Sequence, residues 1–166
     1  MESLPTSPHS PIVAVDDDSD DIDLLRILFR KAGISRPLEI YRHGEELIAS
    51  LSSLLKKSVQ AAVLPSLCFL DVKMPAADGH EVLRWIRKQP ELDRMSVVII
   101  SQSEHPTDIK QAARDGAQCY LAKYPRPSVL KSVISEAERM SDTRVADEWF
   151  GLPENLLLRW GFSSKV

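Results

Sequence analysis

Five short apolar segments recur along the chain, separated by longer stretches of mixed polarity. They are PIVAVD (11–16), LEIYR (38–42), LCFLDV (67–72), SVVIIS (96–101) and QCYLAK (118–123). Each is rich in β-branched or aromatic residues and is bounded by turn formers, which is typical of strands buried on both faces. The pattern therefore predicts five strands.

Apolar residues at helical spacing fill the stretches between these segments. After the first segment they are Ile22, Leu25, Phe29 and Ala32. Ser19 or Asp20 is the expected N-cap of this helix, and Gly33 is expected to end it. HEVLRWIRKQ (80–89), TDIKQAARDG (107–116) and PSVLKSVISEAERM (127–140) have the same helical character. Strands that alternate with helices predict an α/β fold, a doubly wound five-stranded parallel sheet with flanking helices.

A chain of 166 residues is long enough for one domain with a substantial core. We expect this domain to span residues 11–140, after a flexible N-terminus at 1–10. Residues 141–166 form a tail that is too apolar to be left in water, so it is expected to pack on the domain or at an interface. Its apolar residues include Val145, Trp149, Phe150, Leu152, Leu156, Leu157 and Trp160.

Composition and charge exclude several classes of protein. The chain is 43% hydrophobic and 27% charged, as in ordinary globular proteins, and its net charge of -3 gives no general attraction to nucleic acid or anionic lipid. It contains neither a membrane-spanning apolar stretch nor a recognisable secretory signal, so a cytoplasmic location is expected. Cys68 and Cys119 lie inside predicted strands, where buried structural thiols are expected.

Polar residues that could bind ligands or take part in a reaction lie at the ends of the predicted strands. Asp16 and Asp17 follow the first strand, Asp71 follows the third, Ser101 ends the fourth and Lys123 ends the fifth. Ligands of open α/β sheets bind beyond the carboxyl ends of the strands. We therefore expect these five side chains to meet at one edge of the sheet.

Carboxylates gathered at one edge need a compensating cation, because otherwise some would bind protons at neutral pH. Mg²⁺ prefers oxygen ligands and is usually held by one or two carboxylates with water and phosphate oxygens. Asp16 and Asp17 are candidate ligands, and Asp71 is a third candidate that can also attack a phosphoryl group. Lys123 and Ser101 would interact with oxygens of that group.

Four motifs carry these residues: VAVDDDSDD (13–21), FLDVKMPAADG (69–79), VVIISQSE (97–104) and GAQCYLAKYP (116–125). Together they resemble the receiver domain of two-component response regulators over roughly residues 10–140. The resemblance implies a flavodoxin-like fold with strand order 2-1-3-4-5. It also implies that Asp71 accepts a phosphoryl group from a sensor histidine kinase or a histidine phosphotransfer protein. The Mg²⁺ ligands would be Asp16, Asp17, Asp71 and the backbone carbonyl of Lys73.

The same resemblance makes Lys123 the phosphate-binding lysine and makes Ser101 and Tyr120 the switch residues. QPELDRMSVV (89–98) and ADEWFGLPE (146–154) resemble stand-alone receivers paired with bacterial phytochrome-type kinases, which often form dimers and carry no output domain. The expected output is contact with a downstream protein, with no role for nucleic acid or membrane. The chain is thus expected to be a signalling switch that promotes its own phosphorylation, not an enzyme.

Two positions depart from the family pattern. Tyr124 separates Lys123 from Pro125, where the family usually has a lysine followed directly by a proline in a cis bond. A cis bond before a residue other than proline costs roughly 2.5 to 4 kcal/mol, which argues against it here. Gln102 follows the switch hydroxyl, where a small residue is usual, and is expected to alter the kinetics of phosphorylation.

The remaining polar residues are expected to have structural roles or to lie at the protein surface. Asp18, Asp20 and Asp21 lie in the first turn of the first helix, where acids complement the helix dipole. The histidines lack metal-ligand spacing and are expected at the surface: His9, His43, His80 and His105. The segment ASLSSLLKKSVQAAVLPS (49–66) is a long connection for a receiver.

Two alternative functions are carried forward. The chain could be a receiver-like scaffold that binds partners without phosphorylation, as Gln102 and the missing lysine–proline pair would allow. It could also be a Mg²⁺-dependent phosphatase with an aspartyl nucleophile. Such phosphatases place a second acid two residues after the nucleophile, where this chain has Lys73.

Overall fold

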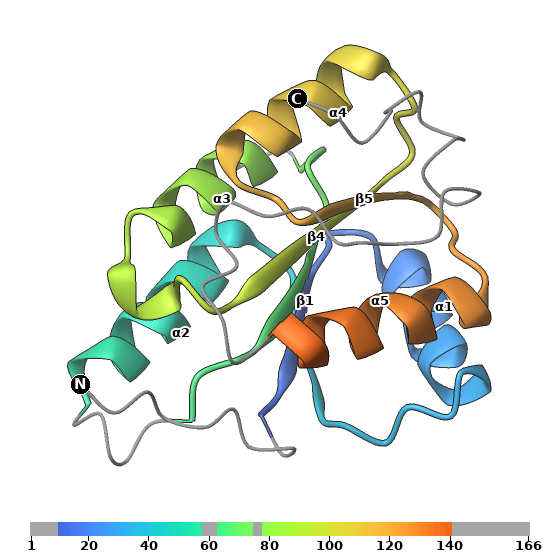
Figure 1. The fold of residues 1–166 in the computed structure, drawn as a ribbon, viewed down its shortest axis with the longest axis horizontal. Helices are drawn as coiled ribbons and strands as arrows, with labels where there is room; N and C mark the ends of the chain where they lie inside the picture. Colours follow the sequence, from blue (N-terminus) through green and yellow to red (C-terminus); the bar gives the residue numbers. More distant parts are fainter. Residues whose placement is uncertain (1–9, 58–62, 75–77, 141–166) are drawn as a thin grey trace.

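A five-stranded parallel sheet forms the centre of the computed structural model, which describes residues 10–57, 63–74 and 78–140 (Figure 1). The strand order is β2-β1-β3-β4-β5, which confirms the predicted fold class and order. The strands are β1 (Ile12–Val15), β2 (Leu38–Tyr41), β3 (Leu67–Leu70), β4 (Ser96–Ser101) and β5 (Cys119–Ala122). Each lies within the segment that the apolar pattern predicted.

Helices cover both faces of the sheet. One face carries α1 (Ser19–Lys31) and α5 (Pro127–Met140), and the other carries α2 (Gly44–Lys56), α3 (Gly79–Arg87) and α4 (Pro106–Asp115) (Figure 1). A short 3-10 helix, Pro90–Leu92, lies between α3 and β4. The stretch 49–66, predicted to be a connection, is helical as far as Lys56.

The alternation of side chains along the strands produces two cores. Val13 and Val15 of β1 belong to the cluster packed against α2, α3 and α4, whereas Ile12 and Ala14 belong to the cluster packed against α1 and α5. Phe69 of β3 lies in the second cluster, and its ring meets Phe29 of α1 edge to face with centroids 5.9 Å apart. Burial on both faces explains why the strands are continuously apolar.

The ends of α1 differ in part from the prediction. Asp18 is the N-cap, because its carboxylate accepts hydrogen bonds from the backbone N–H groups of Asp20 and Asp21. The expectation of Ser19 or Asp20 was therefore wrong by one or two residues. Gly33 follows the helix with a φ of 70°, a conformation that glycine adopts without steric cost, as predicted.

Two predicted regions lie outside the described residues. They are most of the N-terminal stretch, residues 1–9, and the apolar tail at 141–166, including ADEWFGLPE. Among the residues that the structure describes, no helix combines the length and the apolarity needed to cross a membrane.

Cys68 of β3 and Cys119 of β5 are buried free thiols, as the sequence predicted. Burial raises the pKa of each thiol to about 12, so almost no reactive thiolate is present near neutral pH. We expect neither cysteine to react with a disulfide reagent in the folded protein at about pH 8, and both to react in guanidinium chloride. Rapid labelling of either cysteine in the native protein would contradict this burial.

Candidate functional site

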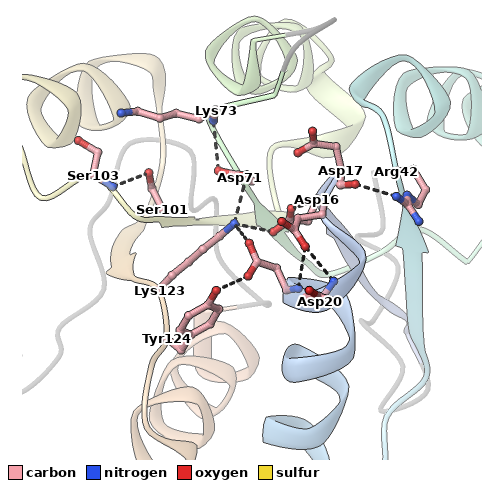
Figure 2. A network of polar contacts seen from close by, with 12 residues as sticks. Asp16, Asp17, Asp20, Arg42, Asp71, Lys73, Ser101, Ser103, Lys123 and Tyr124 are labelled. Carbon is pink, nitrogen blue, oxygen red and sulfur yellow. Dashed lines mark hydrogen bonds and ion pairs between the residues drawn. The ribbon is translucent and has the colours of Figure 1, made fainter.

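The carboxyl ends of β1, β3, β4 and β5 bring the predicted residues to one edge of the sheet. Asp16, Asp71 and Lys123 directly follow β1, β3 and β5, and Ser101 ends β4. The strands are paired in parallel, with Val15 of β1 opposite Leu70 of β3, so the two aspartates leave the sheet side by side. Figure 2 shows the side chain of Lys123 extending toward both aspartates.

Lys123 lies at the centre of the site. Its ammonium nitrogen is 2.8 Å from Asp16 Oδ2, 2.6 Å from Asp21 Oδ2 and 3.3 Å from Asp71 Oδ2. The lysine side chain is only 5% exposed. Burial lowers the pKa of Lys123, but hydrogen bonds to Asp16 and Asp21 outweigh that effect and raise it above its usual value. The ammonium group therefore stays charged.

Three carboxylates form a candidate metal centre. Asp16, Asp17 and Asp71 each offer one oxygen, and these oxygens lie within 4.8 Å of one another. Such a set of hard oxygen donors fits Mg²⁺, which is usually bound through one or two carboxylates together with water and phosphate oxygens. The backbone of Asp17 is held by Arg42, whose Nη2 donates to the Asp17 carbonyl at 2.7 Å (Figure 2).

Asp71 is buried between the loop that follows β3 and Lys123. Its Oδ1 accepts a hydrogen bond of 3.1 Å from the backbone N–H of Lys73, while its Oδ2 faces Lys123. Burial raises the pKa of Asp71, and the positive charge of Lys123 partly offsets that rise. The side chain of Lys73 is exposed, and its backbone carbonyl remains a predicted metal ligand.

Asp21 is the site residue that sequence reasoning missed. It was predicted only to complement the helix dipole from the first turn of α1, but it is 8% exposed and contacts both Lys123 and the hydroxyl of Tyr124. Burial raises the pKa of Asp21, yet the hydrogen bonds from Lys123 and Tyr124 outweigh burial and lower it. A signal was available in the sequence, because Asp21 shares the apolar helix face with Leu25 and Phe29 at spacings of four and eight.

Both predicted switch residues, Ser101 and Tyr120, contact the backbone of Ser103. The Ser101 hydroxyl accepts a hydrogen bond from the Ser103 N–H at 3.1 Å, and the Tyr120 hydroxyl donates to the Ser103 carbonyl at 2.9 Å. Both Ser101 and Tyr120 are buried, whereas Gln102 between Ser101 and Ser103 is exposed. The structure therefore links the two switch residues through one backbone segment.

The bond between Lys123 and Tyr124 is cis, contrary to the expectation from the sequence. In the folded chain, the side chains on both sides of this bond contact the same carboxylate, Asp21.

The surface position predicted for the histidines is confirmed for two of them. His43 and His105 are exposed, as predicted, and His9 lies outside the described residues. The expectation of a surface residue was wrong for His80, whose side chain is 14% exposed and whose Nδ1 lies 2.9 Å from Asp115 Oδ2. This contact explains its burial, because a neighbouring carboxylate satisfies the ring nitrogen.

Comparison with known proteins decides the family. The model of the response regulator receiver domain matches residues 12–135. The chain belongs to this family. The response regulator Rcp1 of Synechocystis sp. is 30% identical over 118 residues, which cover 71% of this chain and 79% of Rcp1. The probable methanogenesis regulatory protein FilR2 of Methanothrix harundinacea is 29% identical over 125 residues, which cover 75% of this chain and 79% of FilR2.

Solved receiver structures agree with this assignment. The phosphorylated cyanobacterial phytochrome response regulator RcpA is 26% identical, with a TM-score of 0.62 over 87% of this receiver and 99% of RcpA. The Mn²⁺-bound form of Rcp1 is 25% identical, with a TM-score of 0.57 over 86% of this receiver and 99% of Rcp1. The similarity to phytochrome-associated regulators, predicted from sequence motifs, is thus confirmed. Membership of the receiver family disfavours the phosphatase alternative. The sequence agrees, because Lys73 stands where such a phosphatase would have its second acid, two residues after Asp71.

Gly79 permits the backbone to pack closely beside Asp71. A Cβ atom at Gly79 would lie 2.4 Å from the Asp71 carbonyl oxygen and 2.6 Å from Val72 Cα, so the backbone would have to shift. We expect Gly79→Ala to lower the free energy of unfolding in urea by about 1–3 kcal/mol. Gly33→Ala is the matched control, because a Cβ there meets nothing within 4 Å and only the positive φ is penalised. A smaller loss for Gly79→Ala than for the control would contradict the steric argument.

Proposed function

We propose that this receiver accepts a phosphoryl group on Asp71 from a sensor histidine kinase or a histidine phosphotransfer protein. The observation that carries the proposal is the convergence on Asp71 of one ammonium group, that of Lys123, and two further carboxylates, those of Asp16 and Asp17. A surface aspartate selected only for solubility would not be buried beside a lysine. The chain would then act as a switch that transmits the signal through protein contact.

The transfer requires few chemical groups. An Asp71 oxygen attacks phosphorus, the oxygen–phosphorus bond forms, and the bond from phosphorus to the donor imidazole nitrogen breaks, leaving that nitrogen with the electron pair. Lys123 already lies 3.3 Å from Asp71 Oδ2, so its charge is in place to stabilise the transferred oxygens. Ser101, at the end of β4, is the proposed hydroxyl donor to another of these oxygens.

Asp16, Asp17 and Asp71 are the residues proposed to hold Mg²⁺, with the carbonyl of Lys73. When bound, the cation would neutralise the carboxylates and the charge of the phosphoryl oxygens. The Mn²⁺-bound form of the relative Rcp1 supports a divalent cation in this protein as well. In this structure Lys123 contacts two of the three carboxylates, Asp16 and Asp71.

A phytochrome-type kinase is the proposed partner class within this function. It is supported by the relative RcpA, which is a cyanobacterial phytochrome response regulator. Release of Ser101 from Ser103 toward the phosphoryl group would free the segment that also binds Tyr120. A downstream protein would recognise the resulting surface. A homodimer and a cytoplasmic location are part of the same proposal.

Asp71→Asn should abolish phosphorylation. Incubation with acetyl phosphate and Mg²⁺ should add the mass of one phosphoryl group to the wild-type chain, because the carboxylate supplies the attacking oxygen and the amide of the variant is a far weaker nucleophile. Intact mass spectrometry measures the product, and Asp23→Asn, an exposed change on α1, is the control. An unmodified wild-type chain would favour the alternative of a scaffold that works without phosphorylation.

Asp17→Asn should weaken binding of Mg²⁺ by at least about tenfold, because one charged oxygen ligand becomes neutral. Isothermal titration calorimetry with Mg²⁺ measures the change directly and requires no phosphoryl donor. Asp23→Asn again controls for the loss of one negative charge on the protein. Equal affinities of wild type and Asp17→Asn would remove Asp17 from the proposed ligand set.

A further inference from the structure

Asp21 is a buried acid with two hydrogen-bond partners, both in the segment that follows β5. Its Oδ2 accepts a hydrogen bond of 2.6 Å from Lys123, the shortest of the three contacts of that ammonium group. Its Oδ1 accepts a hydrogen bond from the hydroxyl of Tyr124. One carboxylate of α1 thus joins two consecutive residues after β5.

The three N–H donors of Lys123 are distributed over three carboxylates, and only one of these lies outside the proposed chemistry. Asp71 is the proposed acceptor and Asp16 a proposed metal ligand, so both acquire new partners during the reaction. Asp21 keeps its oxygens free of those roles. It can therefore hold Lys123 throughout the reaction, while the other contacts of the lysine change.

Tyr124 determines how Asp21 is oriented. The tyrosine is 50% exposed, yet its hydroxyl points inward to Asp21 (Figure 2 shows Tyr124 below Lys123). A lone carboxylate can rotate to offer either oxygen, whereas one whose second oxygen is bound by a hydroxyl presents the first in a fixed direction. The exposed Asp20 beside it shows that complementing the helix dipole does not require burial.

We propose that Asp21, oriented by the hydroxyl of Tyr124, is a positioning residue that holds the Lys123 ammonium group for phosphoryl transfer to Asp71. This inference rests on the proposed function. It assigns a role to the tyrosine that separates the lysine from Pro125, which the family pattern left unexplained. Neither Asp21 nor Tyr124 touches the reacting atoms, so both act through Lys123.

The test compares the rates of phosphorylation by acetyl phosphate in Tyr124→Phe, Asp21→Asn and the double variant. We expect each single variant to react about fivefold more slowly than wild type, because one fixed hydrogen bond of the positioning chain is lost in each. The double variant should be no slower than Asp21→Asn, since both changes remove the same support. Asp23→Asn, exposed on the same helix, should react like wild type.

Tyr124→Phe separates positioning from charge. It removes one surface hydroxyl and no charge, so it should fold normally, whereas Asp21→Asn also reduces the repulsion of an incoming anion. If Asp21→Asn changes the rate and Tyr124→Phe does not, the effect is one of charge and the positioning role is overturned. Rates equal to wild type in both variants overturn it as well.

A second readout is independent of phosphorylation. In protein labelled with ¹⁵N-lysine, the ammonium signal of Lys123 should be observable by NMR because its protons are held in hydrogen bonds and exchange slowly. The signal should weaken or vanish in Asp21→Asn and persist in Asp23→Asn. An unchanged signal in Asp21→Asn overturns the inference. A wild-type chain that takes up no phosphoryl group contradicts the proposed function instead, and the NMR comparison then decides the positioning of Lys123 by itself.

Discussion

The contact of the Lys123 ammonium group with the carboxylates of Asp16, Asp21 and Asp71 is the interaction on which the site depends. Carboxylates gathered at one edge would repel one another and bind protons if no cation lay among them. The burial of the lysine makes the loss of any partner costly, because an uncompensated charge would remain in a poorly hydrated place. Charge balance therefore requires these side chains to be present together.

That requirement ties the chemistry to the whole sheet. Asp16 follows β1, Asp71 follows β3 and Lys123 comes after β5, so the three side chains meet only when all strands between them are paired. The two apolar cores on opposite faces fix the sheet, and with it the positions of the strand ends. The charges are thus arranged during folding, before any ligand binds.

The parts of the fold that follow from periodicity could be predicted from the sequence, and the parts that depend on side-chain partners could not. Buried strands such as Leu67–Leu70 are visible as apolar runs, and parallel strand ends place Asp71 and Lys123 together in any such sheet. Asp21 was misjudged because the first-turn position has a sufficient local explanation, while its partners lie at Lys123 and Tyr124. His80 was misjudged for the same reason, since its partner Asp115 belongs to another helix.

Ser103 connects the two proposed switch residues through its backbone. Its backbone N–H binds the Ser101 hydroxyl and its backbone carbonyl binds the Tyr120 hydroxyl, so one residue receives both proposed switch side chains. A Ser101 hydroxyl that turned to a phosphoryl oxygen would leave the Ser103 N–H without this acceptor and would alter the segment that also holds Tyr120. Under the proposed function, the phosphoryl group would need no contact with Tyr120 to change its surroundings, because it would only have to favour the conformation in which Ser101 is turned.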